Sequence, residues 1–278
     1  MKYAIPFVRD EQLLSEVDEV VVNFLHSENL IDFITKHEKQ RVIINIGDPD
    51  FFISQDTNME LLKKINEISQ ENKYNIAIRI EDYKSSKAMI PIYDELNKAN
   101  VPMFFNTHCS NWDTLIGLLE GYNVSDIYVT DELGFELDKV SKVVHNYGAN
   151  VRVFPNIAQS VWFATPGLLK FFIMPEDIQY YEDYVDVCEI FSPKLGHLEL
   201  APIVKSYKDQ KWFGRFDEFI IDYIGDLDSK SLVNIFGERR ATCGKKCQKG
   251  SHCRICHRLE DLNSTLGRRG FYFADDTE

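Results

Sequence analysis

Short apolar runs and amphipathic stretches alternate along the first 190 residues of the chain. The runs are rich in Val, Ile and Phe, which favour extended strands. They predict strands at 3–8, 19–24, 41–46, 75–80, 102–106, 126–130, 150–154 and 186–191, with 169–173 as a competing or additional strand. Between them, apolar residues recur at helical spacing, which predicts helices over 59–71, 89–99, 111–121 and 136–147.

Continuous apolar strands separated by helices are typical of a parallel sheet covered on both faces. About eight such strands in this length of chain favour a (β/α)8 TIM-barrel-like domain. A doubly wound open sheet is the alternative. We place the barrel at 1–200, followed at 201–278 by a small C-terminal helical extension that carries a four-cysteine metal-binding knuckle.

The barrel interpretation locates a candidate site, because active sites of such barrels lie at the carboxyl-terminal ends of the strands. Polar and often acidic residues follow the predicted strands there. The catalytic candidates are His108, Glu132, Asp131 and Glu81, and the substrate-binding candidates are Asn45, Asp48, Asn106 and Asn156. His108 is the strongest acid/base candidate, since an imidazole exchanges protons near neutral pH.

The same residues also fit an ordinary structural role, because polar side chains at loop starts cap the helices that follow. No G-x-S-x-G, P-loop, G-x-G-x-x-G or H-E-x-x-H signature occurs in the chain. The sequence motifs therefore assign no hydrolase class.

Four cysteines lie within fourteen residues in the spacing C-x3-C-x5-C-x2-C. They are the most closely spaced set of potential metal ligands in the sequence. They are Cys243, Cys247, Cys253 and Cys256. Short chelate loops with glycines at 244 and 250 can bring four thiolates to one metal. Such a set suits tetrahedral zinc or an iron–sulfur cluster of the 4Fe–4S type. Free surface cysteines and disulfides are the remaining alternatives.

Charge is unevenly distributed along the chain. The formal net charge of −13 argues against a general nucleic-acid coat. The segment 239–258 nevertheless contains seven Lys or Arg and no Asp or Glu. These cations either relieve the negative charge of a four-thiolate metal site or contact a partner, nucleic acid or an acidic protein surface.

The apolar runs are too short for a transmembrane helix or a signal peptide, so we expect no membrane partner. The cysteine usage is typical of a reducing compartment, and we expect a cytoplasmic protein.

Several segments, in their order along the chain, resemble the peptidase U32 family. Residues 184–190, Tyr-Val-Asp-Val-Cys-Glu-Ile, are similar to its "Gly-Val-Asp-Ser-Phe-Lys-Ile" strand, and 129–133, Val-Thr-Asp-Glu-Leu, to its "Ser-Arg-Glu-Leu". Further similar segments are 2–24, 30–46, 105–112 and 202–207. The resemblance covers about two thirds of the chain and implies a barrel fold.

The departures from the family concern its cluster ligands. Where members carry "His-Gly-Ala-Leu-Cys", this chain reads Phe154-Pro155-Asn156-Ile157-Ala158, without histidine or cysteine. The resemblance implies peptide cleavage or an iron–sulfur-dependent hydroxylation of an RNA base or quinone precursor. The other hypothesis is a non-catalytic barrel scaffold whose structural zinc knuckle binds protein or nucleic acid.

Overall fold

The computed structural model describes residues 1–23, 30–46, 65, 67, 75–81, 90–106, 111–128, 136–156, 173–190 and 197–211. The chain divides into two compact units, and each is described by itself. The first comprises residues 1–133, 137–153 and 184–189, and the second comprises 134–136, 154–183 and 190–278.

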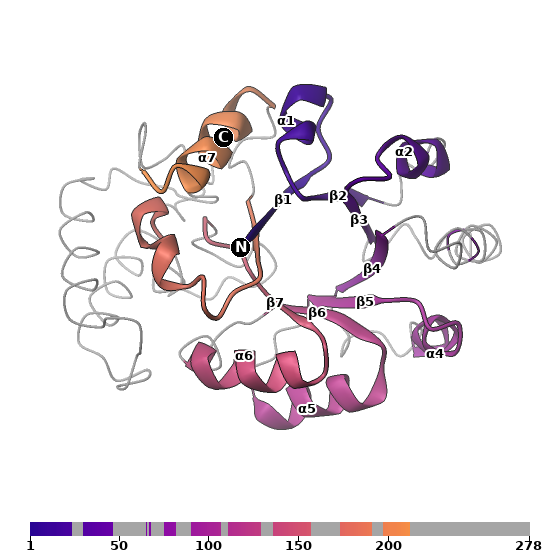
Figure 1. The fold of residues 1–278 in the computed structure, drawn as a ribbon. Coiled ribbons are helices and arrows are strands. Elements are labelled where there is room, and N and C mark those ends of the chain that lie inside the picture. The colour runs from indigo at the N-terminus through magenta and orange to yellow at the C-terminus, as the bar shows by residue number, and fades with distance from the viewer. Residues whose placement is uncertain are drawn as a thin grey trace, which may run out of the picture. The chain divides into compact units, whose positions relative to one another are not determined.

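The first unit is a closed barrel of eight strands, in sequence order and all parallel (Figure 1). Each strand pairs with the next, and β1 closes the ring by pairing with β8. This confirms the predicted (β/α)8 barrel and excludes the doubly wound open sheet. The strands are β1 (Lys2–Pro6), β2 (Glu19–Asn23), β3 (Arg41–Asn45), β4 (Asn75–Glu81), β5 (Met103–Asn106), β6 (Val124–Tyr128), β7 (Asn150–Val153) and β8 (Val187–Glu189).

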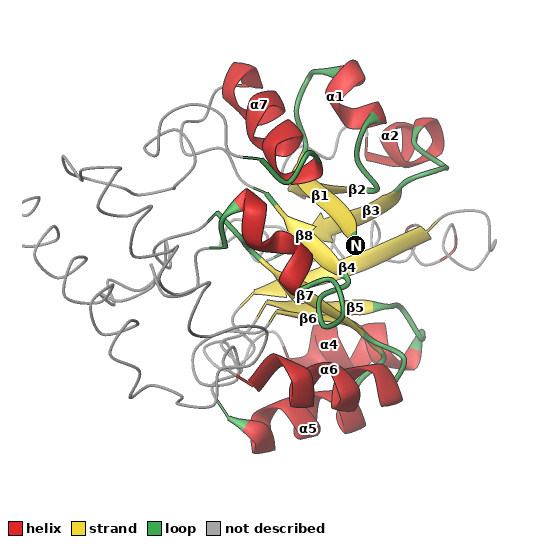
Figure 2. Cartoon of the chain, turned by 60° about the vertical axis from the view of Figure 1, so that its left-hand side comes forward, coloured by secondary structure: helices red, strands yellow, loops and turns green. Residues whose placement is uncertain are grey.

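Helices on the outside of the barrel connect its strands, as Figure 2 shows. Local capping fixes where two of them begin. Asp10 accepts hydrogen bonds from the amides of Gln12 and Leu13, and Asn111 accepts one from the amide of Thr114. The helices of this unit are α1 (Glu11–Ser15), α2 (Leu30–Lys36), α4 (Ile90–Lys98), α5 (Trp112–Gly121) and α6 (Leu137–Asn146).

An apolar layer fills the space between the strands and these helices. Alternate strand residues supply its inner side, including the fully buried Ile44 and Ile78. Helix residues such as Leu30, Leu115 and Val144, each at most 1% exposed, supply its outer side. The hydrophobic effect therefore acts mainly outside the ring of strands, which leaves the lumen for other side chains.

Carboxylates tie the strands together at their amino-terminal ends. Asp18 accepts a hydrogen bond from the amide of Tyr3 at 2.8 Å, just before β2. Asp186, just before β8, accepts from the amide of Val151 at 2.8 Å and contacts the Nε2 atom of His145 at the same distance. Polar residues at this end of a (β/α)8 barrel usually serve stability.

The second unit contains a short 3-10 helix, η5 (Pro175–Tyr180), and the helix α7 (His197–Lys208). The two helices contact each other. The buried Tyr207 hydroxyl donates to the carbonyl of Ile173 at 2.8 Å, and the Ile173 amide donates to the carbonyl of Pro155. Most of the predicted helix 59–71 and of the competing strand 169–173, and all of 212–278, lie outside the described residues.

Candidate functional site

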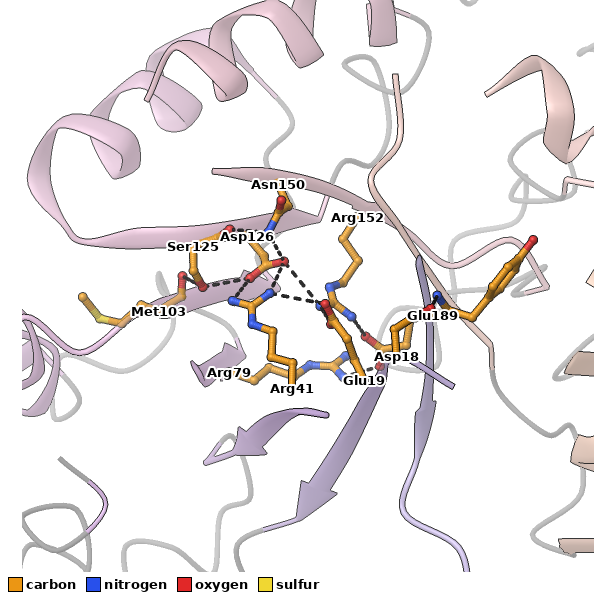
Figure 3. Close-up of polar contacts among 11 residues, drawn as sticks. Asp18, Glu19, Arg41, Arg79, Met103, Ser125, Asp126, Asn150, Arg152 and Glu189 are labelled. Atoms are coloured by element: carbon orange, nitrogen blue, oxygen red, sulfur yellow. Dashed lines mark hydrogen bonds and ion pairs between the residues drawn. The ribbon is translucent and has the colours of Figure 1, made fainter. Parts of the chain in front are cut away.

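Six charged side chains meet inside the barrel and form what we call the lumen network. They come from six different strands: Glu19 from β2, Arg41 from β3, Arg79 from β4, Asp126 from β6, Arg152 from β7 and Glu189 from β8. None is more than 8% exposed. Figure 3 shows how their side chains point toward one another. Charged residues are rarely buried unless they are paired, so their partners decide what this network does.

Strand geometry explains how these residues reach the lumen. Successive side chains of a strand point to opposite faces of the sheet. Glu19 and Arg41 are register partners at the first positions of β2 and β3, and Glu19 and Glu189 are both register partners of Ala4. The network also joins strands that are not neighbours in the sheet, which is feasible only through the interior.

Arg152 is the centre of the network and is fully buried. Its Nη1 atom donates to Oε2 of Glu189 at 3.1 Å, and its Nη2 atom donates to Oδ1 of Asp126 at 3.3 Å and to Oε2 of Glu19. Its guanidinium also lies over the Phe104 ring, 4.6 Å from the ring centroid. One cation thus serves three carboxylates and packs against an aromatic face.

Arg41 and Arg79 complete the pairing. Two hydrogen-bonded contacts join Arg41 to Asp126, from Nη1 to Oδ1 at 2.9 Å and from Nη2 to Oδ2 at 2.6 Å. Arg79 donates from Nη1 to Oε1 of Glu189 at 2.6 Å, across the barrel from β4 to β8. Charge-assisted contacts between guanidinium and carboxylate are among the strongest polar contacts in proteins.

The electrostatic environment keeps Asp126 and Arg152 charged. Burial alone would raise the pKa of Asp126, but the guanidinium groups of Arg152 and Arg41 outweigh it. Together with hydrogen bonds from Arg41 and Ser125, they hold this pKa below its ordinary value. Burial would lower the pKa of Arg152, whereas Glu19, Asp126 and Glu189 raise it. Neither group is therefore prepared to exchange protons near neutral pH.

The chemistry that the lumen network can perform is consequently structural. It contains three arginines and three carboxylates, so its formal charges cancel, and each member is paired with an opposite charge. A compensated set of this kind fixes the strands that carry it relative to one another. The lumen network is thus a rigid interior on which a site at the strand ends can be built.

Three of the predicted site residues end adjacent strands at the carboxyl-terminal side of the barrel. Asn45 is the last residue of β3, Glu81 of β4 and Asn106 of β5. The backbone register pairs Asn45 with Arg79 and Glu81 with Asn106. Glu81 and Asn106 thus lie side by side at this end of the barrel, and Asn45 ends the adjacent strand at the level of Arg79.

Of the other predicted site residues, the structure describes Asn156. Asn156, three residues beyond the end of β7, is buried and belongs to the second unit. Asp48, His108, Asp131 and Glu132 lie outside the described residues, and so do the four cysteines Cys243, Cys247, Cys253 and Cys256. Their roles remain predictions. Within the described ranges, no three or more His, Cys, Asp or Glu side chains are grouped so that they could hold a metal ion.

Sequence reasoning did not predict the lumen network, although a signal was present. Arg79 and Arg152 interrupt the apolar runs Ile-Ala-Ile-Arg-Ile and Val-Arg-Val, where a charge is costly unless it is paired. The acidic residues Glu19, Asp126 and Glu189 in other predicted strands would have suggested pairing through the interior. The sequence analysis treated these strands as continuous apolar runs and so overlooked the charged residues that alternate with apolar ones within them.

No family model matches the chain, and no significant match to a curated protein or to a solved structure was found. In the part of the chain that the structure describes, no helix is both long enough and apolar enough to cross a membrane.

Proposed function

We propose that the protein is an enzyme that binds a polar substrate at the carboxyl-terminal end of its barrel. One observation carries this proposal: Glu81 and Asn106 are register partners at that end, and Asn45 is the last residue of the adjacent strand β3. In characterised (β/α)8 enzymes, catalytic and binding groups come from these strand ends and the loops that follow them. The compensated lumen network below supplies the rigid support that such a site needs.

In this proposal the loop residues supply the chemistry. His108 follows β5 by two residues and acts as the acid/base group, with Glu132, Asp131 and Glu81 as further carboxylates. Asn45, Asp48 and Asn106 contribute polar contacts to the substrate. The U32-like order of segments favours either peptide cleavage or hydroxylation of an RNA base.

The proposal assigns the metal to the four C-terminal cysteines. Four thiolates within fourteen residues are a donor set that fits zinc or a 4Fe–4S cluster. A zinc ion there would stabilise the fold of the segment, whereas a cluster would supply electron transfer. Anaerobic purification followed by elemental analysis and a visible spectrum distinguishes the two metals. Cys253→Ser should release the metal, and retention of a full complement of metal in this variant would contradict a four-thiolate site.

The test of the enzyme proposal compares His108→Ala and Glu132→Ala with a matched surface variant, Lys98→Ala. Each protein is assayed for cleavage of a mixed peptide pool and for hydroxylation of total RNA, and its melting temperature is recorded. We expect both loop variants to lose activity with an unchanged melting temperature, while Lys98→Ala keeps activity. Full activity in both loop variants would contradict the assigned roles.

The cysteine spacing and the basic segment 239–258 favour a second candidate function, a scaffold whose zinc knuckle binds an acidic partner. A colourless zinc protein, inactive in both assays, that binds RNA or an acidic protein in a salt-dependent way would favour this function. Charge neutralisation of Lys245 and Lys246 should then weaken that binding.

A further inference from the structure

The lumen network divides along the middle of the barrel. Strands β1–β4 form one half and β5–β8 the other. The first half contributes Glu19, Arg41 and Arg79 to the network, and the second contributes Asp126, Arg152 and Glu189. Within the network, the first half therefore carries one carboxylate and two guanidinium groups, a formal charge of +1. The second carries two carboxylates and one guanidinium, a formal charge of −1.

The closest contacts of the network all run between the two halves. Arg41 meets Asp126, Arg79 meets Glu189, and Arg152 meets Glu19. We call these the cross-lumen pairs. The shortest contact is 2.6 Å in the first pair and 2.6 Å in the second.

Contacts within one half are longer. Arg41 lies 3.5 Å from Glu19 inside the first half. Inside the second half, Arg152 lies 3.1 Å from Glu189 and 3.3 Å from Asp126. In the closed barrel each half thus buries a net charge whose closest partners lie in the other half, and burial without those partners would be costly.

We infer that the cross-lumen pairs form last during folding, when two half-barrels of complementary charge meet and close the barrel. The strands and helices of each half are local in sequence, so their contacts form at a low cost in loop closure. The pair Arg79–Glu189 spans 110 residues of chain, and Arg152–Glu19 spans 133. Charge complementarity then favours the correct partner half and disfavours pairing of like halves from two chains.

The inference makes a kinetic prediction for the full-length protein. A contact formed after the folding transition state changes the unfolding rate and leaves the refolding rate almost untouched. Asp126→Asn removes the charge from the partner of Arg41 while it keeps the shape of the side chain. We expect this variant to unfold roughly tenfold faster and to refold within about twofold of the unaltered protein.

Two controls probe contacts inside one half. Ile34→Val in α2 trims a buried side chain of the first half, and Leu118→Ala in α5 does so in the second. Both helices join consecutive strands of the same half. We expect a clear fraction of the stability that each variant loses to appear as slower refolding, because the contacts of these side chains form while each half folds.

The experiment is a stopped-flow series over denaturant concentration for all variants. If Asp126→Asn does not fold, Arg79→Lys tests the same point, since it keeps the charge and loses the guanidinium fork. Slower refolding of the cross-lumen variant, in proportion to its lost stability, would overturn the inference. Unaltered refolding of both control variants would overturn it as well, because the halves would then not form first.

Discussion

Arg41 and Asp126 lie on strands β3 and β6 and meet inside the barrel through two contacts, of 2.9 Å from Nη1 to Oδ1 and 2.6 Å from Nη2 to Oδ2. Both side chains are at most 8% exposed. Loss of one partner should leave a buried, less compensated charge. We expect Asp126→Leu to lower the free energy of unfolding by about 3–5 kcal/mol, as measured by urea denaturation.

The double variant Arg41→Met with Asp126→Leu is the matched comparison for this prediction. It removes one charge of each sign, so the four remaining members of the lumen network stay neutral as a set. Apolar replacement of a whole buried pair is often close to neutral for stability. We expect the double variant to be markedly more stable than Asp126→Leu. A double variant less stable than both single variants would show that the pair stabilises the fold beyond mere compensation.

The lowered pKa of Asp126 predicts a loss of stability in acid. Its pKa is lower in the folded protein than in the unfolded chain, where an aspartate has a pKa of about 3.9. The carboxylate therefore contributes stability fully above that value, and the contribution is lost as the pH falls toward the lower, folded pKa. The difference in free energy of unfolding between wild type and Asp126→Asn should shrink from pH 7 to pH 3. A constant difference would contradict the lowered pKa.

Gly148, just after α6, has a positive φ of 76° and should resist substitution. Its amide donates to the carbonyl of His145 and so closes the end of the helix. A Cβ atom at this position would meet nothing within 4 Å, so the cost is purely conformational. We expect Gly148→Ala to lower the free energy of unfolding by about 1–2 kcal/mol. Gly117→Ala, inside α5 and equally free of clashes, should instead raise it by up to about 1 kcal/mol. Thermal unfolding of both variants measures this contrast in sign.

Asn111, three residues after His108 in the sequence, caps α5. Its Oδ1 atom accepts a hydrogen bond from the amide of Thr114 at 2.9 Å. Asn111→Ala should lower the free energy of unfolding by about 1 kcal/mol, because that amide loses its partner, whereas Asn111→Asp should keep the cap. Equal stability of the alanine and aspartate variants in urea denaturation would show that the cap contributes nothing.

The alternation of apolar runs and helices was enough to predict the barrel, because strand spacing and β-branched residues are local properties of the sequence. The predicted strands at 19–24 and 41–46 end within one residue of β2 and β3. Strand β6 begins at Val124, two residues before the expected start, because the polar Ser125 concealed the beginning of the apolar run. The spacing of apolar residues did not predict α1, since its five residues are too few to show a helical period, whereas the resemblance of residues 2–24 to an opening strand, helix and second strand implied a helix there.

The interior of the barrel could not be predicted in this way. Whether Glu19 pairs with Arg152 depends on barrel closure, which places β2 and β7 within reach of each other. Pattern analysis examines one strand at a time, whereas these partners lie 133 residues apart. The positions of Asn45, Glu81 and Asn106 were easier to predict, because the carboxyl-terminal ends of all strands in a parallel barrel lie at the same end of the barrel.

Cancellation of charge inside the lumen network has a consequence for the electrostatic potential at the strand ends. Three positive and three negative groups held a few ångströms apart produce a field that decays with distance much faster than that of a single charge. The lumen therefore adds little to the potential that an incoming molecule experiences. Under the proposed function, the sign of the charge on the ligand is therefore set by residues outside the lumen network, and substitution of those residues can change it while the interior stays intact.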